Sequence, residues 1–145
     1  MALKYSVGYR TTVMTALATA VTSSGVIVLY GGTPPADCAT AYTATSPLAT
    51  WVSNAAQFGI AASGVLTVST LINSTVTAGA GAPGTATWWA IYPSATTTGT
   101  NRVAQGTVGL PASGADWIIT NTSIAASQNV TLNNSSAPTF TAGNA

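Results

Sequence analysis

The chain has 145 residues, the length of one domain, and only 3% of them are charged. Three cations (Lys4, Arg10 and Arg102) and two carboxylates (Asp37 and Asp116) give a net charge of +1, with no histidine. Because an ordinary soluble domain is about one quarter charged, this composition is unusual. It excludes nucleic-acid binding by phosphate neutralisation and disorder driven by high charge.

The remaining surface must be built from hydroxyl, amide, glycine and small apolar groups, since 47% of the residues are hydrophobic and charges are scarce. Such a surface packs easily against copies of itself, because few charges have to be desolvated. We therefore expect an obligate homo-oligomer. The alternative is a monomer that its hydroxyl groups keep in solution.

The first predicted element is a short helix over Thr11–Ser23, lying on a sheet. Thr11 or Thr12 would cap its start, and Gly25 would follow its end. Five apolar residues share one face of this helix: Val13, Met14, Leu17, Ala20 and Val21.

From Gly25 onward the sequence predicts strands. The clearest is Val26–Tyr30, a continuous apolar run that ends at the Gly31–Asp37 loop. Short strands separated by Gly, Pro, Asn and Ser are typical of an all-β, mainly antiparallel sandwich or barrel. The other expected strands are Leu48–Ser53, Gly64–Ile72, Thr85–Tyr92, Arg102–Val108, Trp117–Thr120, Asn129–Leu132 and Thr139–Thr141.

We expect residues 1–145 to form a single domain, with possible arms at residues 1–10 and 133–145. The segment Ala78–Gly84 lies between two predicted strands and indicates a hairpin loop. Thr11–Tyr30 is too polar to span a membrane. The same threonines weigh against a signal peptide, so we expect an unprocessed chain made in the cytosol, with no membrane association.

The sequence offers little for catalysis. A serine or cysteine nucleophile needs a base, usually histidine, which is absent. Asp37 and Asp116 both occupy turn-like positions, where a carboxylate bonds nearby backbone amides. Cys38 cannot form an internal disulfide or hold a metal alone. We expect no enzymatic activity, no metal and no cofactor.

The aromatic residues and arginines are the candidates for an interface. Trp88 and Trp89 should point to opposite faces of one strand, one into the core and one toward a second layer or a partner. Arg10 and Arg102 could pair with a carboxylate within the chain or across an interface, or form ordinary surface salt bridges. The full set of interface candidates is Arg10, Tyr30, Trp88, Trp89, Tyr92, Arg102 and Trp117.

Several segments resemble small structural proteins of tailed bacteriophages and prophages. The similarity spans Ala2–Gly109, although the family more often has an arginine near Ala90. The matching features are Arg10, Met14, Val26–Ala36, Pro47–Ala49, Phe58–Gly59, Gly64–Thr67 and Gly84–Trp88.

This resemblance implies an all-β virion component present in many copies, and no active-site residues. The expected function is that of a trimeric capsid decoration (cement) protein, whose partners are its own copies and the major capsid protein. It would be made in the host cytoplasm and located in the virion. The alternatives are a tail, baseplate or head-fibre protein, and a lectin-like or ice-binding surface module.

Overall fold

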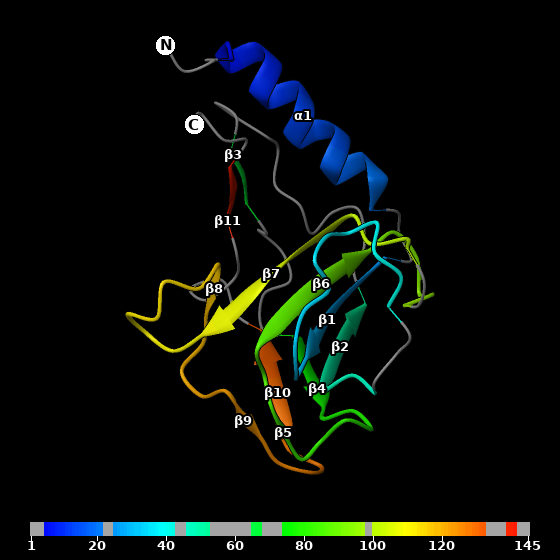
Figure 1. Ribbon diagram of the computed structural model, residues 1–145, viewed down its shortest axis with the longest axis vertical. Helices are drawn as coiled ribbons and strands as arrows, with labels where there is room; N and C mark the ends of the chain where they lie inside the picture. The colour runs from blue at the N-terminus through cyan, green and yellow to red at the C-terminus, as the bar shows by residue number, and fades with distance from the viewer. Residues whose placement is uncertain are drawn as a thin grey trace.

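The computed structural model describes residues 5–21, 25–42, 46–52, 65–67, 74–97, 100–132 and 139–141 (Figure 1). The fold is mostly β, with one helix, α1 (Val7–Ala20). The strands are β1 (Val26–Tyr30), β2 (Ala49–Val52), β3 (Val65–Thr67), β4 (Ser74–Thr77), β5 (Gly84–Thr85), β6 (Trp88–Tyr92), β7 (Ala104–Gly109), β8 (Trp117–Ile118), β9 (Ser123–Ile124), β10 (Asn129–Leu132) and β11 (Thr139–Thr141).

A curled five-stranded sheet forms the centre, in the order β2-β1-β6-β7-β8. The β7–β8 pair is parallel, whereas the other neighbours in this sheet are antiparallel. The register places Val28 opposite Thr50 on one side and Ala90 on the other. Three two-stranded pairs complete the described strands: β10–β4, β11–β3 and β5–β9.

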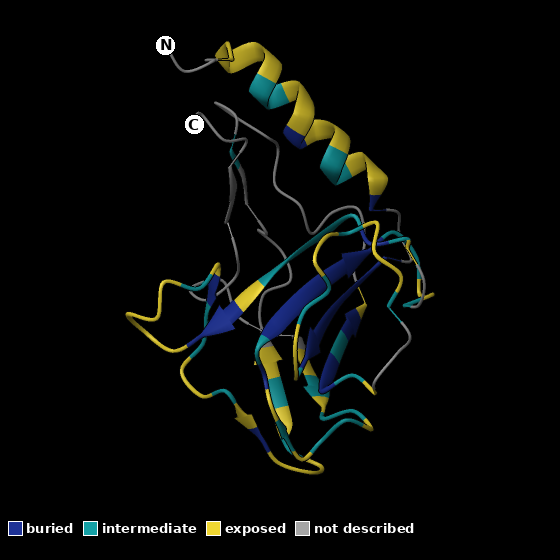
Figure 2. Ribbon diagram, in the orientation of Figure 1, coloured by how far each residue is buried: buried dark blue, intermediate teal, exposed yellow. Residues whose placement is uncertain are grey.

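Strands β1 and β6 are buried on both faces, which explains the continuous apolar run in β1 (Figure 2). Alternate residues of a strand point to opposite faces. Thus Ile27 and Leu29 join one core cluster, whereas Val28 and Tyr30 join another.

The larger cluster contains Trp51, Trp89 and Trp117, whose ring centroids lie 6.1 Å (Trp51 to Trp117) and 6.4 Å (Trp89 to Trp117) apart. Val76 of β4 and Val130 of β10 pack against it. The β4–β10 pair therefore covers this face of the central sheet.

The helix differs from the prediction at both ends. It begins at Val7 rather than Thr11, because the Ser6 side chain accepts a hydrogen bond from the Tyr9 backbone N–H and caps the helix there. It ends at Ala20, since Val21 already has an extended conformation. Residues 7–10, which fall within the possible arm at residues 1–10, are therefore the first part of α1.

The buried face of α1 is also shifted from the predicted one. Met14 and Val21 are buried and Leu17 packs beside them, as expected. Val13 and Ala20 are exposed, however. The helix lies beside β3, which pairs with β11 in a two-stranded sheet (Figure 1). Its buried residue Met14 also belongs to the larger core cluster, together with Ile27 and Leu29 of the central sheet.

One strand prediction needs correction, and two strands were missed. The predicted strand Thr85–Tyr92 is split into β5 and β6, because the Ala86 N–H donates to Thr122 and the Thr87 N–H donates to Tyr30. Strands β4 and β9 were not predicted. Of the expected Gly64–Ile72 strand, only β3 lies within the described residues, and of residues 133–145 only β11 does.

Candidate functional site

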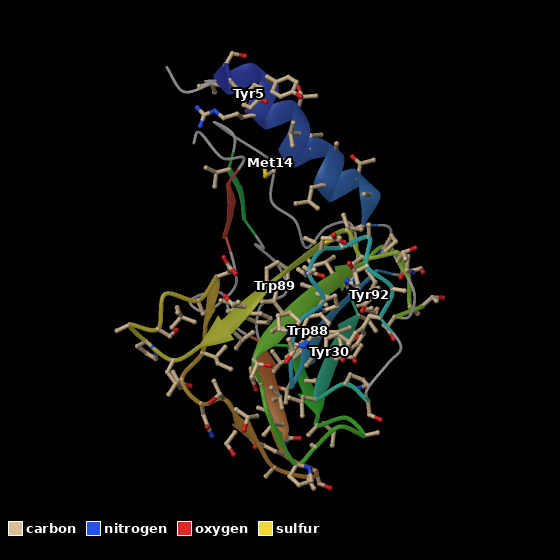
Figure 3. The ribbon with its side chains drawn as sticks, viewed as in Figure 1. Tyr5, Met14, Tyr30, Trp88, Trp89 and Tyr92 are labelled. Carbon is tan, nitrogen blue, oxygen red and sulfur yellow. The ribbon has the colours of Figure 1, made fainter. Side chains whose placement is uncertain are left out.

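The best-defined cluster of candidate residues covers one face of the central sheet, where the aromatic side chains of β1 and β6 meet (Figure 3). The rings of Tyr30 and Trp88 stack, with centroids 4.3 Å apart. Tyr42, from the following loop, meets both rings edge-on, at 5.4 Å from Tyr30 and 5.0 Å from Trp88. We call Tyr30, Tyr42, Trp88 and Tyr92 the aromatic cluster.

The polar atoms of this cluster are bonded internally. The hydroxyl groups of Tyr30 and Tyr92 share a buried hydrogen bond of 3.1 Å, and the Trp88 indole N–H donates to the Gly31 carbonyl at 3.2 Å. Burial, followed by the bond to Tyr92, raises the pKa of Tyr30 far above its ordinary range. The phenol therefore stays neutral, and we infer a packing role for it rather than acid–base chemistry.

Arg102 fastens the loop between β1 and Tyr42 over this cluster. Its side chain is 5% exposed, and its Nη2 group donates to the backbone carbonyls of Asp37 and Thr40. Its Nε donates to the Gln105 side chain at 2.8 Å. The guanidinium carbon also lies 5.9 Å from the centre of the Tyr42 ring, within cation–π range.

Gln105 provides a second attachment for the same loop. Its register opposite Ala90 in β6 places it on the face of the aromatic cluster. While its carbonyl oxygen accepts from Arg102, its amide group donates to the Pro35 carbonyl at 2.8 Å. Arg102 and Gln105 together hold residues 35–40 in one shape; we call this arrangement the loop clamp.

The tip of the clamped loop is a turn organised by Asp37. One carboxylate oxygen accepts from the backbone N–H groups of Ala39 (2.9 Å) and Thr40 (2.6 Å) and from the Thr40 hydroxyl (2.9 Å). These bonds, those of Thr40 first, lower the pKa of the exposed Asp37 carboxyl, and the charge of Arg102 adds to the effect. The predicted turn role of Asp37 is therefore confirmed.

Cys38 lies half-buried in the same loop. Burial raises the pKa of its thiol, against the opposing effect of the Arg102 charge. A thiol with a raised pKa is a poor nucleophile at neutral pH.

Asp116 serves a different part of the structure. One of its carboxylate oxygens accepts from both the backbone N–H and the hydroxyl of Thr107 in β7, each at 2.8 Å. It therefore ties the segment before β8 to its neighbouring strand. Each of the two carboxylates bonds to its own local partners, as expected for structural residues.

The structure places the other interface candidates as follows. Trp88 and Trp89 belong to opposite clusters, as predicted from their spacing, yet both are buried, at 0% and 3% exposed. Trp117 is 2% exposed, in the cluster with Trp89. Arg10 lies on α1, half-buried, away from the loop clamp. A partner would meet the aromatic residues only through the elements that cover them, so their role at an interface stays a prediction.

Two open hollows on the surface of the described residues have uncharged linings. One, of about 520 Å³, is lined by small residues from the loops around β5, including Gly31, Gly81 and Thr85. The other, of about 590 Å³, runs along α1 between Thr11 and Ala20. Neither contains an ionisable side chain, so both suit binding by shape rather than by charge.

The described residues contain no group of three or more His, Cys, Asp or Glu side chains that could hold a metal ion. No helix in this part of the chain is long and apolar enough to cross a membrane. The loop clamp holds residues 35–40 of the Gly31–Tyr42 loop through bonds to their backbone carbonyls.

Sequence reasoning selected Arg102 but missed Gln105 and Tyr42. Gln105 follows Arg102 by three residues, a spacing that strand alternation would place on opposite faces. Only its register opposite Ala90 shows that it faces the aromatic cluster. Tyr42 had no sequence signal either, since its position depends on how the loop folds back. Comparison of the chain with protein families, curated sequences and solved structures finds no match.

Proposed function

We propose that this protein is a bacteriophage capsid decoration protein, which forms a homotrimer on the outside of the head and binds adjacent major capsid subunits. Its role is structural rather than enzymatic, without cofactor or nucleic acid. It would be made in the host cytoplasm and incorporated into the virion. Each copy adds association free energy to the shell, and contact with several subunits multiplies that effect.

The observation that carries the proposal is the scarcity of charge in a folded chain: 3% of 145 residues. A protein that is free in solution usually keeps a charged surface, because a net charge near zero promotes association. A surface that stays in contact with other proteins has no such need, and its few charges lower the desolvation cost of binding.

The loop clamp supports the same proposal. A surface loop that is already fixed loses little conformational entropy when it binds. Arg102 is one of only three cations in the chain, yet it is buried beneath residues 37–40 and holds their carbonyl groups. This use of a rare charge favours the Gly31–Tyr42 loop as a contact with the capsid.

For the fold, we propose a mainly antiparallel sandwich. The central sheet would be one layer and the β4–β10 pair part of the second. Val76 and Val130 packing on the larger core cluster supports this assignment.

The alternatives differ in how well they agree with the described residues. A lectin-like module would use exposed tryptophans as sugar platforms, but all four tryptophans are at most 3% exposed. An ice-binding plane needs regular ranks of threonine, and the Thr75–Thr131 hydroxyl pair across β4 and β10 is a single rung. A tail, baseplate or head-fibre protein remains the main rival.

Immunoelectron microscopy of the virions that contain this chain separates these functions. Antibodies against the purified protein should label the whole surface of the head. Label confined to the tail or baseplate would move the protein to the rival class, and intact virions without label would overturn a surface location altogether.

A further inference from the structure

The outer face of α1 is the side that points away from the buried Met14. This face carries no charged residue, and most of its side chains are exposed (Figure 2). Tyr5 stacks on Tyr9 at its N-terminal end, with ring centroids 5.0 Å apart, and the two side chains are 45% and 54% exposed. Val13 is 39% exposed one turn further on. Tyr9 lies on the side of the helix opposite Met14, and Val13 lies at the edge of that side.

The threonines of α1 make this face less polar than the sequence suggests. The hydroxyls of Thr12, Thr15 and Thr19 each donate to the backbone carbonyl four residues earlier, at 3.1, 3.0 and 2.9 Å. With each donor satisfied inside the helix, burial of these side chains leaves no unbonded hydroxyl hydrogen. The face can therefore be covered by another apolar surface at little desolvation cost.

The shape of the same face favours a second helix. Gly8, Thr12, Ala16 and Ala20 recur every four residues and are all exposed, and a Cβ placed on Gly8 would meet no atom within 4 Å. Small residues at this spacing let two helices approach closely. The hollow of about 590 Å³ along α1 lies over Thr12 and Ala16.

The lack of charge on this face limits which kinds of partner can bind to it. Arg10 is the one charged residue of α1, and it lies toward the half-buried side. A helix that binds lipid surfaces usually carries several Lys or Arg residues on its polar side, so α1 does not fit that class. A charged protein partner would lose hydration here without gaining an ion pair. An identical, equally uncharged helix has neither problem.

We propose that the outer face of α1 packs against α1 of a second copy of this chain. This proposal rests on the proposed homo-oligomer, because it names the surface through which two copies meet. It does not depend on binding to a capsid.

Disulfide trapping tests the contact directly. Thr12 lies near the middle of α1 on its outer face, so two packed copies of this face would bring their Thr12 side chains close together. In a Cys38→Ser background, Thr12→Cys should give a covalent dimer on mild oxidation of the purified protein. The control is Leu110→Cys in the same background, because Leu110 is 47% exposed in the turn after β7 and should not crosslink. Absence of the Thr12→Cys dimer, or equal crosslinking of both variants, would overturn the proposal.

A charge variant gives a second measurement that does not rely on cysteine chemistry. Ala16→Glu keeps a good helix former but places a carboxylate in the middle of the face. We expect its self-association to weaken about tenfold or more, while Leu110→Glu keeps the native mass by light scattering. If Ala16→Glu keeps that mass, the α1 contact is wrong although the homo-oligomer stands. A monomeric wild-type protein would overturn both.

Discussion

Arg102 shows at the scale of single residues how a scarce charge is used. It is the buried charged side chain among the described residues, and two backbone carbonyls and one amide oxygen accept its hydrogen bonds. A guanidinium can satisfy several acceptors at fixed angles, which an ammonium group cannot do. Its removal would leave the carbonyls of Asp37 and Thr40 without these donors beneath the loop.

Replacement of Arg102 by Gln should therefore lower the free energy of unfolding by about 1–3 kcal/mol, the cost of losing charged hydrogen bonds to partly buried carbonyls. Urea unfolding followed by tryptophan fluorescence measures the change. Arg102→Lys should recover only part of the loss, because it keeps the charge without the fork-shaped donor group. A Gln variant as stable as the wild type would contradict the loop clamp.

Asp37 makes a pH-dependent contribution to stability. Its hydrogen bonds with Thr40 and Ala39 lower the pKa of its carboxyl in the folded state, so the contribution is complete above the unfolded value of about 3.9. It is lost as the pH falls through the lowered folded-state pKa. Asp37→Asn should remove this dependence.

Comparison of the two unfolding midpoints between pH 2 and pH 7 checks this expectation. The difference between wild type and Asp37→Asn should be constant near neutral pH and shrink in acid. A difference that grows as the pH falls would show that the carboxylate is not stabilised by the turn.

At the scale of elements, close packing between β6 and β7 depends on a glycine. A Cβ on Gly106 would lie 2.9 Å from ring atoms of Trp89 and 2.8 Å from a carboxylate oxygen of Asp116. Both neighbours are fixed, Trp89 in the core and Asp116 by its bonds to Thr107. Strand β7 therefore cannot take a larger residue at this position without moving one of them.

Gly106→Ala should lower the free energy of unfolding by about 1–3 kcal/mol through overpacking. The matched control is Gly8→Ala in α1, where the added methyl group meets no atom within 4 Å. That control should be neutral or stabilising, by up to about 1 kcal/mol, because alanine is the better helix former. Equal effects of the two substitutions, measured by thermal unfolding, would refute the packing argument.

The elements also show what a sequence can predict. Strand β1 was predicted at its observed bounds, because an apolar, β-branched run closed by Gly31–Gly32 has few alternatives. The break after β5 was missed, since it depends on bonds from residues 86 and 87 to Thr122 and Tyr30, which are distant in sequence. The predicted helix began too late because Val7, Gly8 and Tyr9, which follow the capping residue Ser6, are weak helix formers.

The candidate site follows the same division. The turn at Asp37 and the opposite faces of Trp88 and Trp89 are local properties of the chain, and both were predicted. The loop clamp joins Arg102 and Gln105 to carbonyl groups more than 60 residues away. Because backbone carbonyls carry no signature in the sequence, no pattern could have identified these acceptors.

At the scale of the whole molecule, the aromatic side chains and the charges have separate uses. The four tryptophans stabilise the two faces of one sheet, Arg102 stabilises a loop, and Asp37 and Asp116 stabilise their local turns. What remains outside includes the uncharged outer face of α1 and the Gly31–Tyr42 loop. This division agrees with a molecule that works in permanent contact with other protein subunits.

The most direct test of the proposed function is the copy number of this chain in purified virions, measured by quantitative mass spectrometry against the major capsid protein. A decoration protein should be present at a ratio near one copy per capsid subunit. A handful of copies per particle would contradict the account and assign the protein to the tail.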